Sequence, residues 1–187
     1  FVFYSARSSF REGMLRMLPT MALPRSLYRL GWPKRAMQAL IRGAFRISAV
    51  QRLVHRMYGI VVILGKPESR GQIRIASPNP AEAALIDSGY FSVDADLETM
   101  VNGVELARKM AGSASLAAYG NRALIPGSRS KSRDQIARFI KQNVMTTYHY
   151  AGTCRMGTDL DSVVDGELRV RRVAGLRIAD ASVIPSV

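Results

Sequence analysis

The sequence predicts an α+β fold in which helices and strand pairs occupy separate stretches of the chain. Apolar residues recur at helical spacing before position 59 and again in two later segments. A β-branched run at 60–64 and an alternating run at 72–75 have the patterns of strands, the first of them buried and the second half-exposed. Helices and strands do not alternate regularly, which argues against a doubly wound parallel sheet.

Prolines divide the first part of the chain into helices. A helical stretch over 8–18 is expected to stop before Pro19, because proline lacks an N–H and restricts the residue before it. Trp32 and Pro33 open a longer helix, since proline suits a first helical turn. The apolar face of that helix is predicted to comprise Met37, Leu40, Ile41, Ala44 and Ile47.

Capping signals place three further helices. Ser48 and Gln51 have the spacing of a capping box, which predicts a helix over 49–58. Asp94 is expected to cap a helix that runs through Met110. A second capping box is formed by Ser132 and Gln135 and starts a helix whose apolar stripe is Ile136, Phe139, Ile140 and Val144. Short strands are predicted at 168–170 and 176–179.

Charge is distributed unevenly along the 187 residues. The whole chain carries 27 Lys and Arg against 14 Asp and Glu, a formal net charge of +13. Residues 1–74 hold 14 of the basic residues and 2 of the acidic ones, so the net charge is +12 there and +1 in the remainder. Such asymmetry is typical of chains that contact nucleic acid or an anionic membrane surface.

Composition excludes several classes of protein. Apolar residues make up 48% and charged residues 22%, which excludes a disordered or fibrous chain. The single cysteine, Cys154, excludes an internal disulfide framework and a cysteine-based zinc cluster, and we expect no metal site. The longest stretch between charges, from Lys141 to Arg155, holds 13 residues, which is too short for a membrane span. No signal-peptide pattern follows Phe1.

The segment 148–157 is the most informative for function. It reads Tyr-His-Tyr-Ala-Gly-Thr-Cys-Arg-Met-Gly and has neither a helical nor a strand period. Its glycines allow close approach of the backbone or positive φ. His149 is one of two histidines, and the histidine side chain suits proton transfer near neutral pH. By itself, a histidine between tyrosines is more often a structural hydrogen-bonding residue.

The C-terminal part of the chain resembles the signature of the glucose–methanol–choline (GMC) family of flavin oxidoreductases. The run His-Tyr-Ala-Gly-Thr-Cys-Arg-Met-Gly at 149–157 is followed by Asp-Ser-Val-Val-Asp at 161–165 and Leu-Arg-Val at 168–170. Gly-Leu-Arg-Ile-Ala-Asp-Ala-Ser-Val-Ile-Pro then occupies 175–185. Lys66–Gly71 and Leu85–Asp87 are similar to the family's substrate-domain strands. The resemblance covers about residues 60–187.

This resemblance implies an enzyme that binds FAD and oxidises an alcohol, with hydride passing from the carbinol carbon to the flavin. The family's conserved histidine falls on His149, which would accept the hydroxyl proton or stabilise the developing alkoxide. Asp180 and Ala181 match the family's D-A-S element beside the ribityl and phosphate part of the flavin, which would make them cofactor-binding residues.

Other roles in the signature are structural. Without the resemblance, Asp180 would be interpreted as a turn or helix cap. Cys154 is expected to be buried packing, because members of the family vary at that position. Arg155 and Met156 are expected to hold the loop in place.

Departures from the family pattern predict a fragment. No two glycines are separated by a single residue, so the G-x-G-x-x-G fingerprint of a nucleotide-binding domain is absent. The family's second active-site residue, a histidine or asparagine, lies beyond the last residue, Val187. We therefore expect the substrate-binding portion of a GMC oxidoreductase, with a mixed sheet and flanking helices, the Rossmann-type part largely missing and no turnover of its own.

The expected organisation is a basic helical arm over 1–59, substrate-domain elements over 60–147 and a signature segment over 148–187 that contacts the flavin. The expected partners are a small-molecule alcohol and the missing N-terminal FAD-binding part of the same protein. Nucleic acid is not expected, because the basic residues alternate with apolar stripes and no nucleic-acid-binding motif is present. The alternative is a basic membrane-surface or interaction module without catalysis of its own. We expect a cytoplasmic location, with membrane association through the arm as an accessory feature.

Overall fold

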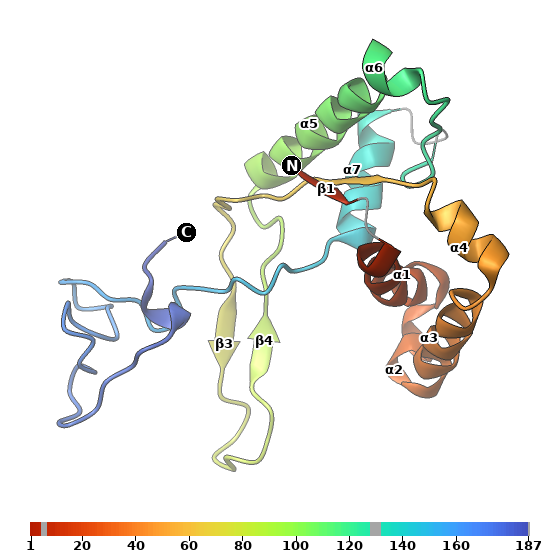
Figure 1. Cartoon of the computed structure of the whole chain (residues 1–187). Coiled ribbons are helices and arrows are strands. Elements are labelled where there is room, and N and C mark those ends of the chain that lie inside the picture. Colours follow the sequence, from red (N-terminus) through yellow and green to blue (C-terminus); the bar gives the residue numbers. More distant parts are fainter. Residues whose placement is uncertain (5–6, 128–131, 187) are drawn as a thin grey trace. The chain divides into compact units, whose positions relative to one another are not determined.

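The computed structural model describes residues 1–4, 7–127 and 132–186, which fold into two compact units (Figure 1). One unit comprises Phe1–Ile63 and Leu97–Val144, and the other comprises Leu64–Asp96 and Met145–Val187. Each unit is therefore built from two stretches that are distant in the sequence. The expected division into 1–59, 60–147 and 148–187 stays a prediction.

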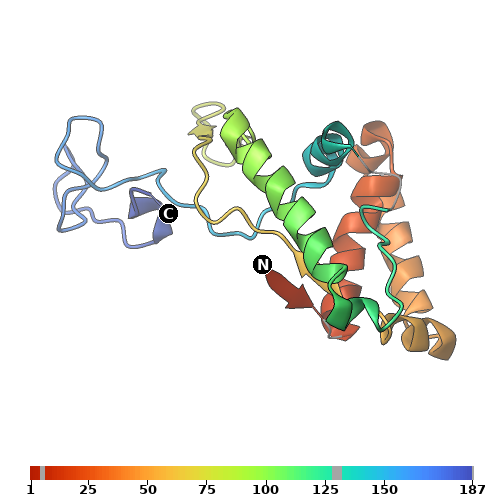
Figure 2. The ribbon, with the colours of Figure 1, turned by 90° about the horizontal axis from the view of Figure 1, so that it is seen from above.

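Helices dominate the first unit (Figures 1 and 2). In chain order they are α1 (Arg7–Ala22), α2 (Arg25–Arg29), α3 (Trp32–Ala44), α4 (Ser48–Val54), α5 (Asp94–Ala111), α6 (Ala114–Ala117) and α7 (Arg133–Asn143). Helix α5 begins in the second unit and continues into the first from Leu97. Buried apolar side chains join α1, α3 and α4, namely Leu15, Ile41, Phe45 and Val54. None of the helices in the described ranges is both long enough and apolar enough to cross a bilayer.

Helix α1 continues through Pro19 to Ala22, so the expectation that it stops before the proline is wrong. Pro19 offers no N–H to the carbonyl group four residues earlier, which belongs to Leu15. The side-chain amide of Gln38 on α3 donates to the Leu15 carbonyl oxygen at 3.2 Å and replaces the missing bond. Pro19 itself is fully buried. A contact with another helix therefore compensates for the proline.

Helix α3 begins at Trp32 with Pro33 in its first turn, as predicted. Its buried face is narrower than expected, because Ile41 is buried whereas Leu40 is exposed. Phe45, which directly follows the helix, is buried with Ile41 against α1.

Helix α4 is shorter than the predicted range of 49–58, and its predicted capping box is absent. The N-cap position is occupied by Ile47, which makes no side-chain capping bond. The helix starts at Ser48 itself, so Ser48 is not at the cap position, and the Gln51 side-chain amide donates to the carbonyl oxygen of Phe45 at 3.0 Å.

The later helices lie where they were predicted. Helix α5 spans Asp94–Ala111 and ends one residue after the predicted Met110, but Asp94 is its first residue and not the expected cap. At the start of α7, Ser132 and Gln135 form the predicted reciprocal capping box. The Gln135 N–H donates to the Ser132 hydroxyl at 3.3 Å, and the Ser132 N–H donates to the Gln135 side-chain oxygen at 3.1 Å.

The described strands form two separate antiparallel pairs and not the expected mixed sheet. In the first unit β1 (Val2–Tyr4) pairs with β2 (Gly59–Val61), and in the second β3 (Gln72–Arg74) pairs with β4 (Leu85–Asp87). Each strand is three residues long and has one partner, so no strand is central. Strand β2 is therefore only partly buried, and β3 is exposed throughout.

The strands predicted at 168–170 and 176–179 are reduced to isolated bridges between Val164 and Val170 and between Arg169 and Arg177. Leu168, Arg172 and Gly175 have positive φ, which turns the backbone and prevents a regular ladder.

Candidate active site

The loop that follows His149 is hydrogen-bonded to the short helix η1 (Ala181–Val183) in the second unit. The Cys154 N–H donates to the Ser182 carbonyl oxygen at 3.0 Å, and the Met156 N–H donates to the Val183 carbonyl oxygen at 2.8 Å. Gly152 begins this part of the loop with a φ of 88°, which an L side chain rarely adopts. The structure thus joins the loop after His149 to the segment that begins at Asp180.

The imidazole of His149 lies at the surface of the second unit. The residue is exposed, and among the residues that the structure describes its side chain has no hydrogen-bond partner. The preceding residue, Tyr148, has a φ of 64°, and its N–H donates to the Thr146 hydroxyl at 2.8 Å. This turn lies directly before His149, whose side chain is exposed.

Tyr90 belongs to the same surroundings, because its hydroxyl lies 3.2 Å from the hydroxyl of Tyr150, the neighbour of His149. Burial and the bond to Tyr150 raise the pKa of Tyr90. Hydrogen bonds from Thr146 and Tyr90 lower the pKa of Tyr150. Sequence reasoning missed Tyr90, and no motif marks it, because it lies in a separate segment between β4 and α5.

Asp180 acts as the N-cap of η1. Its carboxylate accepts from the Ser182 N–H at 2.7 Å, and the hydrogen bonds from the Ser182 side chain and backbone hold the pKa of Asp180 below its ordinary value. The contacts of Asp180 in this structure are therefore those of a helix cap.

Ala181 is exposed, and within the described ranges its N–H donates to no other residue. A free amide on a small residue fits the anionic part of a nucleotide cofactor.

The far end of the loop is held by Arg155 and Gly157. The Arg155 guanidinium donates to both oxygens of Asp159, at 2.8 and 2.7 Å, and this bond keeps the pKa of Asp159 well below its usual range. The Gly157 carbonyl oxygen accepts from the Arg171 guanidinium at 2.7 Å and from the Ser162 hydroxyl at 3.1 Å. Arg155 thus has the loop-holding contact that was expected of it.

Cys154 is only half-buried, so it is less enclosed than expected. Its structural contribution here is the backbone bond to Ser182. No group of three His, Cys, Asp or Glu side chains in the described ranges is placed to hold a metal ion.

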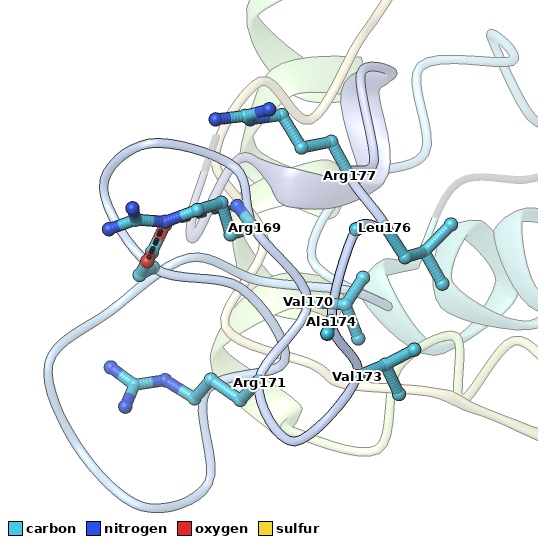
Figure 3. A pocket seen from close by; sticks show the side chains of 9 residues that line it. Arg169, Val170, Arg171, Val173, Ala174, Leu176 and Arg177 are labelled. Carbon is cyan, nitrogen blue, oxygen red and sulfur yellow. Dashed lines mark hydrogen bonds and ion pairs between the residues drawn. The ribbon is translucent and has the colours of Figure 1, made fainter.

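A separate cavity of about 380 Å³ lies at the turn between Val170 and Arg177 (Figure 3). Figure 3 shows three arginines around it, of which Arg169 forms an ion pair with Asp165 at 2.9 Å. Arg171 donates to the Gly157 carbonyl, and Arg177 donates to the Glu167 carbonyl at 3.2 Å. All three guanidinium groups thus have acceptors within the protein. We interpret them as supports of the turn, and the cavity contains neither His149 nor Asp180.

Comparison with known proteins identifies relatives of the chain. The family model described as GMC oxidoreductase matches residues 67–187. An alcohol dehydrogenase [acceptor] of Pseudomonas putida is 40% identical over 121 residues, which are 65% of this chain and 22% of that protein. An oxygen-dependent choline dehydrogenase of Brucella anthropi is 38% identical over 124 residues, again 65% of this chain and 23% of that protein.

Solved structures show the same similarity. Pyridoxine 4-oxidase from Mesorbium loti has a TM-score of 0.61 and 35% identity over 70% of this chain, which is 25% of the oxidase. A fungal aryl-alcohol oxidase has a TM-score of 0.58 and 26% identity over 65% of this chain and 20% of that chain. The chain thus spans no more than a quarter of the length of any of these four relatives.

Proposed function

Because this chain belongs to the GMC oxidoreductase family, we propose that it forms the proton-accepting part of an FAD-dependent alcohol oxidoreductase. The observation that carries the proposal is the pair of backbone bonds from Cys154 and Met156 to η1. These two bonds connect the loop after His149 to the segment that contains Asp180 and Ala181. The names of the relatives, which include an alcohol dehydrogenase, a choline dehydrogenase and an aryl-alcohol oxidase, support an alcohol as the substrate.

Oxidation of an alcohol to a carbonyl compound removes the hydroxyl proton and a hydride from the carbinol carbon. We assign the proton to the imidazole of His149, which is exposed and has no partner in the described residues. Bound FAD supplies the acceptor for the hydride in such a reaction. Proton transfer to a correctly placed side chain contributes about 10²–10⁴-fold to the rate.

Two residues of this chain are proposed to serve the cofactor, Ala181 by direct contact and Asp180 by positioning it. The free N–H of Ala181 would donate to an anionic oxygen of FAD, and the small side chain permits that approach. Asp180 would position this amide, because its carboxylate holds the first turn of η1 through Ser182. Asp180 therefore acts through the backbone of the turn in this proposal.

We also propose that the 187-residue chain alone holds FAD weakly or not at all and has no turnover. Large apolar side chains of the second unit are exposed, as in Ile75 at 87% and Leu160 at 88%. Such surface is typical of a part that packs against more protein. Flavin absorbance and dye-linked alcohol oxidation on the purified chain test this point, and a yellow, active preparation would contradict it.

The assignment of His149 is tested in the flavin-loaded protein that carries this chain. His149→Gln is expected to slow flavin reduction by alcohol about 10²–10⁴-fold in stopped-flow measurements. The chain offers a matched control, because His55→Gln changes the other histidine, which is exposed at the end of α4. An unchanged rate in His149→Gln, or an equal loss in His55→Gln, would overturn the assignment.

A further inference from the structure

Helix α3 has two apolar faces, and only one of them is buried. Ile41 packs in the core of the first unit, with Met37 partly buried against it. A second stripe at spacings of three and four residues is exposed and consists of Trp32, Ala36, Ala39, Leu40 and Gly43. Trp32 is 68% exposed and Leu40 is 74% exposed. An ordinary surface helix has polar residues in place of this second stripe.

Helix α4 also exposes an apolar side chain beside basic ones. Leu53 is 62% exposed, and with Ala49 it lines an open groove of about 520 Å³. The other lining residues are Arg52, His55 and Arg56, so the groove combines an apolar side chain with cationic ones. Figure 1 shows α4 directly after α3 in the same helical group.

In the part of the chain that contains α3 and α4, all the charged side chains are positive. No acidic residue occurs between Glu12 and Glu68. The same stretch carries ten basic residues, namely Arg16, Arg25, Arg29, Lys34, Arg35, Arg42, Arg46, Arg52, Arg56 and Lys66. At 100° per residue, Arg35 and Arg42 follow one edge of the exposed stripe of α3, and Arg46 is exposed in the turn after the helix. We define the basic apolar face as Trp32, Leu40, Leu53 and the arginines at 42, 46, 52 and 56.

We propose that the basic apolar face binds the surface of an anionic lipid bilayer. Tryptophan and leucine enter the boundary between headgroups and acyl chains, while arginines pair with lipid phosphates. Nucleic acid would satisfy the arginines but would leave Leu40 and Leu53 in water. A second copy of the chain would place like charges opposite one another, which costs binding energy. The family model begins at residue 67, so this face lies outside the segment that the model matches.

Trp32 is the only tryptophan of the chain and reports on the binding directly. The 187-residue chain is mixed with vesicles of equal parts phosphatidylglycerol and phosphatidylcholine, or with vesicles of phosphatidylcholine alone. The expected result is a blue shift of Trp32 fluorescence and cosedimentation with the anionic vesicles, both weakened by salt. Equal binding to the neutral vesicles, or no blue shift on the anionic ones, would overturn the proposal.

Matched variants distinguish lipid binding through the basic apolar face from nonspecific binding by other parts of the surface. Arg42→Gln with Arg46→Gln is expected to weaken binding about thirtyfold, because each arginine near an anionic surface contributes a factor of about five. Arg122→Gln with Arg172→Gln removes the same amount of charge outside the basic apolar face and is expected to weaken vesicle binding by less than about threefold. Leu40→Ser with Leu53→Ser should also reduce binding by about tenfold or more, whereas Ile75→Ser with Leu160→Ser should not.

Two further measurements would show that something other than lipid binds the basic apolar face. A fluorescence spectrum already blue-shifted without vesicles, and dependent on protein concentration, would mean that a second copy covers the face. Salt-sensitive binding to random duplex DNA that matches the vesicle affinity would mean a phosphate-binding surface without insertion. Either result overturns the lipid proposal.

Discussion

The Met156 N–H lies 2.8 Å from the Val183 carbonyl oxygen, and this bond with its neighbour from Cys154 to Ser182 joins two distant segments of the second unit. Any change that alters the backbone of one segment must therefore affect the other. His149 and Ala181 both precede the Cys154–Ser182 bond in their segments, Ala181 by one residue and His149 by five.

Gly152→Ala is expected to destabilise the chain by about 1–2 kcal/mol, because φ at this position is 88°. A Cβ there would meet the Ile184 carbonyl oxygen at 3.7 Å, an ordinary contact, so the cost arises from the backbone conformation. Gly166→Ala is the control, since nothing lies within 4 Å of its Cβ, and it should change stability by less than about 0.5 kcal/mol. Urea unfolding measures both, and equal midpoints for the two variants would refute the expectation.

Asp96→Asn is expected to destabilise the chain by about 1–3 kcal/mol at neutral pH. Asp96 is 4% exposed, and its carboxylate accepts from the N–H groups of Glu68 at 2.9 Å and Ser69 at 2.8 Å. An amide group offers one acceptor oxygen, so one buried N–H would lose its partner. Asp94→Asn in the same helical turn is the control, because Asp94 is exposed. A loss of stability as large in Asp94→Asn would contradict the prediction.

Acid should remove the contribution of Asp96. Burial alone raises the pKa of this carboxyl, but the hydrogen bonds from Ser69 and Glu68 and the charge of Arg70 outweigh burial and lower it. The stabilisation is therefore complete above the unfolded pKa of about 3.9 and is lost as pH falls through the lower folded pKa. Melting temperatures of the wild-type chain should fall more steeply below about pH 4 than those of Asp96→Asn. Parallel curves would show that Asp96 does not contribute.

Tyr90→Phe is expected to raise the pKa of Tyr150 towards its ordinary value, because one of the hydrogen bonds that lower it is removed. The pKa should remain somewhat low, since the larger effect comes from Thr146. Carbon NMR of tyrosines labelled at Cζ follows the titration. Tyr119→Phe removes a hydroxyl from an exposed tyrosine of the first unit and should leave the Tyr150 titration unchanged. A Tyr150 titration insensitive to Tyr90→Phe would exclude the coupling.

Gly103→Ala in α5 is expected to destabilise the first unit by about 1–3 kcal/mol, because a Cβ would lie 2.5 Å from a methyl carbon of Val62. Gly43→Ala in α3 has no atom within 4 Å of its Cβ and should stabilise the chain by about 0.4–1 kcal/mol. Both variants make the same change inside a helix, so the difference isolates the contact with Val62. Stabilisation by Gly103→Ala would show that Val62 moves aside freely.

Predictions from the sequence were correct where the deciding groups lie within one turn of each other. Ser132 and Gln135 form their capping box because both side chains reach the same helix start. The same spacing misled at Ser48, since Gln51 bonds to the preceding turn. At Pro19 the deciding group was Gln38, on another helix, and no local pattern reveals it.

The candidate site shows the same limit. His149 and Asp180 could be identified from their motifs, whereas the bonds that join their segments involve backbone groups of Cys154 and Ser182. Backbone groups are the same at every residue, so their pairing leaves no trace in one sequence. Tyr90 likewise reaches Tyr150 only through the fold of the second unit.

Neither unit is a continuous stretch of chain, and this has a consequence for biosynthesis. As the polypeptide leaves the ribosome, residues 1–144 complete the first unit before the second has its final segment. The β3–β4 hairpin, with Ile75 and Ile86 exposed, must then wait in the nascent chain until the His149 loop and η1 have been translated. During that interval its exposed apolar side chains have no partner from the second unit's last segment, so we expect them to influence the yield of folded protein as well as its stability.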